Sequence, residues 1–136
     1  MVKDNQLYLN DILDAILKIE RFTQGISKEK FLNSDLIQSA VIRQLEIVGE
    51  AANKVSKDIQ IEFDSIPWKE IIGTRNKLIH DYSDVDIILV WNIIDIELND
   101  LEKNIREIFR VKGYKRIKKE DGKTKQLLKR AKKFDS

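Results

Sequence analysis

The chain has 136 residues, with 25 lysines and arginines, 23 aspartates and glutamates, one histidine and no cysteine. This length suits one compact domain, and the lack of cysteine excludes disulfides, thiolate catalysis and cysteine-bound zinc. Hydrophobic residues make up 42% and charged residues 35%, a balance too apolar for a disordered chain and too charged for a membrane protein. No apolar run approaches the roughly 20 residues of a bilayer span, and no signal-type segment opens the chain. We therefore expect a cytoplasmic protein without a membrane partner.

The first two predicted helices span residues 5–23 and about 35–57, and both show apolar residues at helical spacing. The face of the first helix is formed by Leu9, Ile12, Ile16 and Ile19. The main face of the second helix is formed by Ile37, Val41, Leu45, Val48, Ala52 and Val55. A further apolar stripe on the second helix consists of Leu36, Ala40, Ile47 and Ala51. We therefore expect the second helix to be buried on two sides.

Two residues in the second helix stand out from its apolar surroundings. Gly49 costs about 1 kcal/mol relative to alanine in a helix interior, so we expect a neighbouring helix to approach it closely. Glu50 is either exposed or the partner of a buried cation. After this helix, residues 59–63 alternate between apolar and polar for too short a stretch and have no partner strand, so we expect a loop there.

The third predicted helix opens at Pro67, which is preset for a first helical turn, and ends near His80. The fourth is about 25 residues long, and Asp84 or Asp86 can cap its start. Its apolar seam has heptad spacing and consists of Ile87, Trp91, Ile94, Leu98, Leu101, Ile105 and Ile108. Four helices with short links predict an all-α, up-down four-helix bundle over residues 1–110. The surplus of apolar surface favours a homodimer.

Charge is distributed unevenly along the chain. Residues 110–136 contain 12 lysines and arginines against 3 acidic residues, which leaves 13 basic and 20 acidic residues for the body. We expect residues 111–136 to form a basic C-terminal tail. Such asymmetry indicates a polyanionic partner, most simply nucleic acid, although a solvated extension has the same composition.

The stretch from Arg75 to Tyr82 gathers the side chains that metal-independent RNA cleavage requires. His80 can move protons near neutral pH, and Arg75 can neutralise a phosphate in a bidentate way. Asn76 lies one helical turn before His80 on the same face. The alternative is structural, because histidine and charged residues are common at helix ends. A two-fold dimer would supply the second histidine that an acid–base mechanism needs.

The spacing Arg75-x4-His80-x-Tyr82 resembles the signature of HEPN domains, and specifically of HepT-like toxins paired with the nucleotidyltransferase antitoxin MntA. The surrounding residues are similar to that family over about residues 1–110, notably Gly49-Glu50-Ala51, Ile66-Pro67-Trp68-Lys69-Glu70-Ile71, Gly73, Val85-Asp86 and Trp91. The basic segment after Arg110 is longer than the usual family body and aligns with no motif.

The resemblance implies a dimeric, HEPN-like helical bundle whose cleft cleaves RNA without a metal or cofactor. It implies catalytic roles for Arg75 and His80, polar support from Asn76 and Asp81, and inactivation by transfer of AMP to Tyr82.

We also infer that Glu50, on the facing helix, is the partner of Arg75. The implied protein is the endoribonuclease toxin of a type VII-like HepT–MntA pair. Two alternatives stay open: a non-catalytic nucleotide- or protein-binding partner of a nucleotidyltransferase, and a purely structural helical dimer.

Overall fold

The computed structural model describes residues 2–80 and 86–117, with the backbone alone at residues 2–4, 79 and 80. Its helices are α1 (Val2–Thr23), α2 (Lys28–Leu32), α3 (Asp35–Lys54), α4 (Lys57–Glu62), α5 (Trp68–His80), α6 (Ile87–Asn92), η2 (Ile93–Glu97) and α7 (Leu98–Lys112). None of these described residues forms a β-strand, and the all-α prediction is confirmed. No helix within the described ranges is long and apolar enough to cross a membrane.

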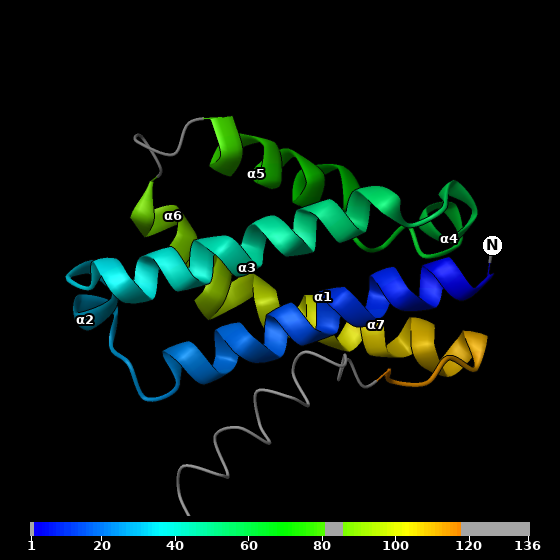
Figure 1. Cartoon of the computed structure of the whole chain (residues 1–136), viewed down its shortest axis with the longest axis horizontal. Coiled ribbons are helices and arrows are strands. Elements are labelled where there is room, and N and C mark those ends of the chain that lie inside the picture. Colours follow the sequence, from blue (N-terminus) through cyan, green and yellow to red (C-terminus); the bar gives the residue numbers. More distant parts are fainter. Residues whose placement is uncertain (1, 81–85, 118–136) are drawn as a thin grey trace, which may run out of the picture.

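The long helices lie side by side around a shared apolar core. Figure 1 shows α3 beside α1 and α5, running in the opposite direction to both. Helix α7 packs against α1. The predicted face of α1 is confirmed, since its four residues are almost completely buried together with Leu13. Burial of these faces, rather than helix propensity, supplies most of the stability of such helices.

Helix starts are fixed by short polar side chains that accept hydrogen bonds from free backbone N–H groups. The Oγ atom of Ser34 accepts from the N–H of Ile37 at the start of α3. An Oδ1 atom of Asp86 accepts from two N–H groups at the start of α6. Of the two predicted caps for this helix, Asp86 is therefore the one observed, and Asp84 lies outside the described residues.

The expected loop at residues 59–63 is wrong, because α4 occupies most of it. Ser56 is the N-cap of α4, and its Oγ atom accepts a hydrogen bond from the N–H of Ile59. Ile59 is buried, whereas Ile61 is 73% exposed. One buried residue is enough to hold a short helix against the core. A pattern of alternating apolar and polar residues over only five positions cannot distinguish such a helix from an extended chain. Helix α3 accordingly ends at Lys54 rather than near residue 57.

Helix α3 is buried mainly along its predicted first stripe. Val41, Leu45 and Val48 are buried there, as are the following members of the stripe at its C-terminal end. The second stripe is buried only at Ala51, and Leu36 is 81% exposed. Burial on two sides is therefore wrong for the first turn of α3. Helices α1 and α5 cover the middle and the C-terminal end of α3.

The predicted fourth helix is interrupted by a wider turn, η2, which has π-helical hydrogen bonding. One extra residue in such a turn rotates the preceding segment relative to the following one. Val90 thereby faces the core together with Leu98, and Trp91 of the predicted seam is only partly buried. Trp91 instead contacts the ring of Phe31 in α2, with 5.4 Å between ring centroids.

Helix α7 continues two residues past Arg110, to Lys112. Gly113 caps the C-terminal end of this helix, and its φ of 69° suits glycine. Residues 114–117 then return along α1, where the carbonyl oxygen of Lys115 accepts from the Gln6 side chain. The remainder of the predicted tail, residues 118–136, lies outside the described residues.

Candidate active site

Helix α5 is held in place by apolar contacts that fix which of its faces points outward. Trp68 in its first turn is buried, and its Nε1 atom donates a hydrogen bond to the carbonyl oxygen of Phe63 at 3.1 Å. Leu78 near the other end is 4% exposed. These two anchors leave Arg75 facing α3, where a glycine lies opposite it.

Gly49 and Arg75 form a close contact between α3 and α5. A Cβ atom built on Gly49 would lie 2.0 Å from Cβ and 2.8 Å from Cγ of Arg75. Real Cβ atoms do not approach other atoms so closely, so only glycine fits. The close helix approach that the sequence predicts at Gly49 is therefore confirmed, and it is Arg75 that occupies the space.

The guanidinium group of Arg75 is partly exposed and contacts both Asn76 and Glu50. Its Nη1 atom donates to Oδ1 of Asn76 at 2.9 Å, and its Nη2 atom lies 4.0 Å from Oε1 of Glu50. Its buried Nε atom has no hydrogen-bond partner in the described structure. The side chain is 32% exposed. A planar group with five donors and one good internal hydrogen bond is suited to receive a phosphate.

Glu50 lies beside Arg75, as the sequence analysis inferred, and it also lies beside a second arginine. The Nη1 atom of Arg43 is 3.9 Å from the same Oε1 atom of Glu50 and 3.2 Å from Oε2 of Glu46. One carboxylate therefore serves two guanidinium groups. Arg43 was missed by the sequence analysis. Its signal was the spacing of Arg43, Glu46 and Glu50, which places all three on one side of a helix.

The remaining predicted site residues are at or beyond the end of α5. His80 is the last residue of that helix, and about 7.5 Å of helical rise separates it from Arg75. Asp81 and Tyr82 lie outside the described residues. The structure thus brings together Arg75, Asn76 and Glu50.

Two cavities between the helices have linings that do not include these three residues. One, of about 410 Å³, is mainly apolar, lies between α3, α5 and the η2–α7 segment, and has Glu70, Glu97 and Asp100 among its lining. The other, of about 850 Å³, lies between α1 and the same segment and includes Glu20. A hydrogen bond to Glu102, together with partial burial, raises the pKa of Glu20 to about 7. The same hydrogen bond, with help from Arg106, lowers the pKa of Glu102.

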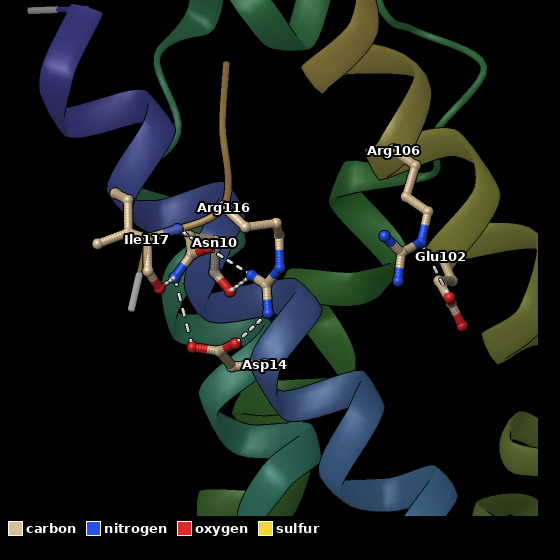
Figure 2. Close-up of polar contacts among 6 residues, drawn as sticks. All are labelled: Asn10, Asp14, Glu102, Arg106, Arg116 and Ile117. Atoms are coloured by element: carbon tan, nitrogen blue, oxygen red, sulfur yellow. Dashed lines mark hydrogen bonds and ion pairs between the residues drawn. The ribbon is translucent and has the colours of Figure 1, made fainter. Parts of the chain in front are cut away.

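A second polar cluster, also missed from the sequence, attaches the C-terminal segment to α1 (Figure 2). Asn10 is completely buried. Its Oδ1 atom accepts from the N–H of Ile117 at 2.9 Å, and its Nδ2 atom donates to the Ile117 carbonyl oxygen at 3.1 Å. Arg116 adds hydrogen bonds to Asn10 and an ion pair with Asp14. An asparagine beside Leu9, within an apolar face, was the available signal.

Comparison with known proteins places the chain among ribonucleases. The sequence profile of the family described as "Ribonuclease HepT-like" matches residues 12–108. The chain belongs to the HepT-like ribonuclease family. The matched range of the HepT-like domain contains Arg75, Asn76, His80 and Tyr82, as well as Gly49 and Glu50. The family resemblance seen in the sequence is confirmed.

Individual relatives of this HepT-like chain carry matching names. It is 38% identical over 108 residues to "Probable ribonuclease HepT" of Thermococcus cleftensis, covering 79% of this chain and 98% of that protein. It is 39% identical over 103 residues to "Putative RNase MJ1380" of Methanocaldococcus jannaschii, covering 76% of this chain and 94% of the relative. No solved structure matches the chain.

Proposed function

We propose that this protein is a metal-independent endoribonuclease that uses Arg75 and His80 to cleave RNA. The observation that carries the proposal is the placement of Arg75, whose Cβ and Cγ atoms pack against Gly49 and whose partly exposed guanidinium makes a hydrogen bond to Asn76. It lies on the helix that ends in the protein's one histidine. Membership of the HepT-like ribonuclease family supports RNA as the substrate.

The reaction that suits these groups is internal transesterification. Neutral His80 takes the proton of a ribose 2′-hydroxyl, and the 2′-oxygen attacks the adjacent phosphorus. The bond from phosphorus to the 5′-oxygen breaks, and a protonated imidazole gives that oxygen a proton. The products are a 2′,3′-cyclic phosphate and a 5′-hydroxyl end. Arg75 stabilises the negative charge that accumulates on the phosphate oxygens, as fixed donors do in other enzymes.

A homodimer completes this site, because one histidine cannot act as base and acid at the same moment. We infer a two-fold arrangement of HEPN-like, up-down four-helix bundles in which each subunit contributes Arg75 and His80 to one cleft. Asn76 supports the arginine through the hydrogen bond described above. Asp81 supports the histidine end of the helix.

The biological role that fits is the toxin of a type VII-like HepT–MntA pair, acting on cytoplasmic RNA. The partner is an MntA-like nucleotidyltransferase that transfers AMP from ATP to the Tyr82 hydroxyl, releasing pyrophosphate. The added phosphodiester places negative charge two residues from His80 and repels the RNA backbone.

The test is cleavage of a labelled single-stranded RNA in excess EDTA by the unmodified protein and by His80→Ala. We expect cyclic phosphate products from the wild type alone, with both proteins equally folded by circular dichroism. Cleavage at equal rates would contradict the role of His80. No cleavage by wild-type protein whose intact mass shows no AMP would favour a non-catalytic partner of the nucleotidyltransferase.

A further inference from the structure

The carboxylate of Glu50 brings a second arginine into the neighbourhood of Arg75. The Nη1 atom of Arg43 and the Nη2 atom of Arg75 lie within 4.0 Å of the same oxygen, Oε1 of Glu50. The two guanidinium groups are therefore no more than twice 4.0 Å apart. Two cations at this separation, with one acid between them, can each receive a phosphate of the same strand.

The position of Arg43 along α3 places it toward the end of α5 that carries His80. Helices α3 and α5 run in opposite directions (Figure 1) and meet where Gly49 faces Arg75. From that contact, Arg43 lies about 9 Å back along α3, and His80 lies about 7.5 Å forward along α5. Since the helices are antiparallel, both displacements point the same way. Arg43 and the histidine end of α5 are thus on the same side of the contact.

Arg43 is exposed and weakly held, which suits a group that exchanges its partner. Its side chain is 59% exposed, and its ion pair with Glu46 spans one turn of α3. Exposed ion pairs of this kind contribute about 0–1 kcal/mol to stability. A phosphate can therefore replace the glutamate carboxylate as the partner of Arg43 at little cost in free energy. Glu46 itself is only 14% exposed. It therefore keeps the arginine over α3 and directed toward Glu50 before a ligand arrives.

We propose that Arg43 is a substrate-binding residue that holds a phosphate of the RNA strand next to the phosphate held by Arg75. The inference rests on the proposed function, which supplies RNA as the ligand. Glu50 then has two tasks: it spaces the two arginines in the free protein, and it yields both to the RNA backbone. Such a second contact fixes the strand in register without reading its sequence.

Binding of uncleavable RNA tests this proposal independently of catalysis. The probe is a labelled, single-stranded 2′-O-methyl RNA of twelve nucleotides, which lacks the attacking hydroxyl, titrated by fluorescence anisotropy at several salt concentrations. We expect Arg43→Ala to weaken binding about tenfold and to reduce the salt slope by about 0.7, the value for one phosphate contact on a single strand. Arg43→Lys should restore the slope but only part of the affinity, because lysine lacks the planar fork.

Arg106→Ala is the matched control, since Arg106 is also an exposed arginine paired with a glutamate on its own helix. It should change affinity less than twofold. Equal losses for Arg43→Ala and Arg106→Ala, or an unchanged slope in Arg43→Ala, would overturn the proposal.

Cleavage of short substrates separates this inference from the proposed function. A dinucleoside monophosphate offers one phosphate, and a trinucleotide offers two. We expect Arg43→Ala to raise KM for the trinucleotide several-fold more than KM for the dinucleoside monophosphate, with kcat preserved. Equal effects on both substrates contradict the second phosphate contact. Wild-type protein that binds RNA through Arg43 but cleaves neither substrate would remove the ribonuclease proposal and leave the role of Arg43 standing.

Discussion

Gly49 and Arg75 are in contact across α3 and α5 at a distance that no side chain on residue 49 can tolerate. The contact positions the arginine by packing its Cβ and Cγ atoms against bare backbone, while its guanidinium reaches Glu50 and Asn76. The close approach of α3 and α5 and the position of Arg75 in the candidate active site therefore depend on the same glycine.

Replacing Gly49 tests this dependence. Gly49→Ala gains up to about 1 kcal/mol of helix propensity, but the new methyl group collides with Arg75, and such overpacking costs about 1–3 kcal/mol. Because the collision is severe, we expect a net loss of about 2 kcal/mol in the free energy of unfolding, measured by urea denaturation. RNA cleavage should fall further than stability explains, since Arg75 is displaced.

Gly73→Ala is the control for this substitution, on the same helix as Arg75. Nothing lies within 4 Å of a Cβ atom built there. We expect it to raise stability by up to about 1 kcal/mol through helix propensity and to leave cleavage unchanged. A stable, active Gly49→Ala variant would show that the two helices can separate without consequence.

Arg75→Lys separates the charge of Arg75 from the shape of its guanidinium group. Lysine keeps the methylene groups that pack on Gly49, so stability should change by less than about 0.5 kcal/mol. It cannot donate two parallel hydrogen bonds to one phosphate. We expect kcat for RNA to fall at least about a hundredfold, the loss typical for one transition-state donor. Wild-type kcat in this variant would mean that charge alone is sufficient.

The Glu20–Glu102 pair predicts how stability depends on pH. The pKa of Glu20 is raised to about 7, so between about pH 4.5 and 7 the folded protein binds more protons there than the unfolded chain does. Its contribution is therefore full below the unfolded pKa and is lost as the pH rises through 7. The lowered pKa of Glu102 acts in the opposite direction, below the ordinary glutamate value.

Urea midpoints measured at pH 5 and pH 7.5 check this prediction. We expect a shallow fall in stability over this interval for the wild type, because the pair is only partly shielded from water. Glu20→Gln should flatten the fall, since glutamine keeps a hydrogen bond to Glu102 without titrating. A Glu20→Gln variant with the wild-type pH profile would assign the fall to other groups.

Asn10 predicts that the C-terminal segment can be released without unfolding the body. Asn10→Ala leaves both backbone groups of Ile117 without their partner, and an unpaired buried group costs about 1–3 kcal/mol. We expect residues 114–117 to detach, which limits the loss of global stability to about 1 kcal/mol. Trypsin should then cut after Lys115 and Arg116 much faster than in the wild type.

Asn53→Ala is the comparison for this experiment, because Asn53 is an exposed asparagine on α3. It should leave the tryptic pattern unchanged. Slow cleavage after Arg116 in Asn10→Ala would mean that the ion pair of Arg116 with Asp14 holds the segment by itself.

The sequence by itself determined the helical class and the buried face of α1, and it named Asp86 as one of two candidate caps. These features are local, since hydrophobic period and capping chemistry act over three or four residues. The spacing of Arg75 and His80 is equally local, because both lie on one helix. Even the close approach at Gly49 was visible as a helix position whose propensity cost needed a reason.

Only the tertiary structure determined which residues of separate segments contact one another. Nothing local identifies Arg75 as the group opposite Gly49, or Asn10 as the anchor of Ile117, which lies 107 residues away. The wide turn at η2 was likewise determined by tertiary packing, since one extra residue there lets both Val90 and Leu98 reach the core. Such contacts depend on how separate helices pack, and packing is set by the whole chain rather than by any one segment.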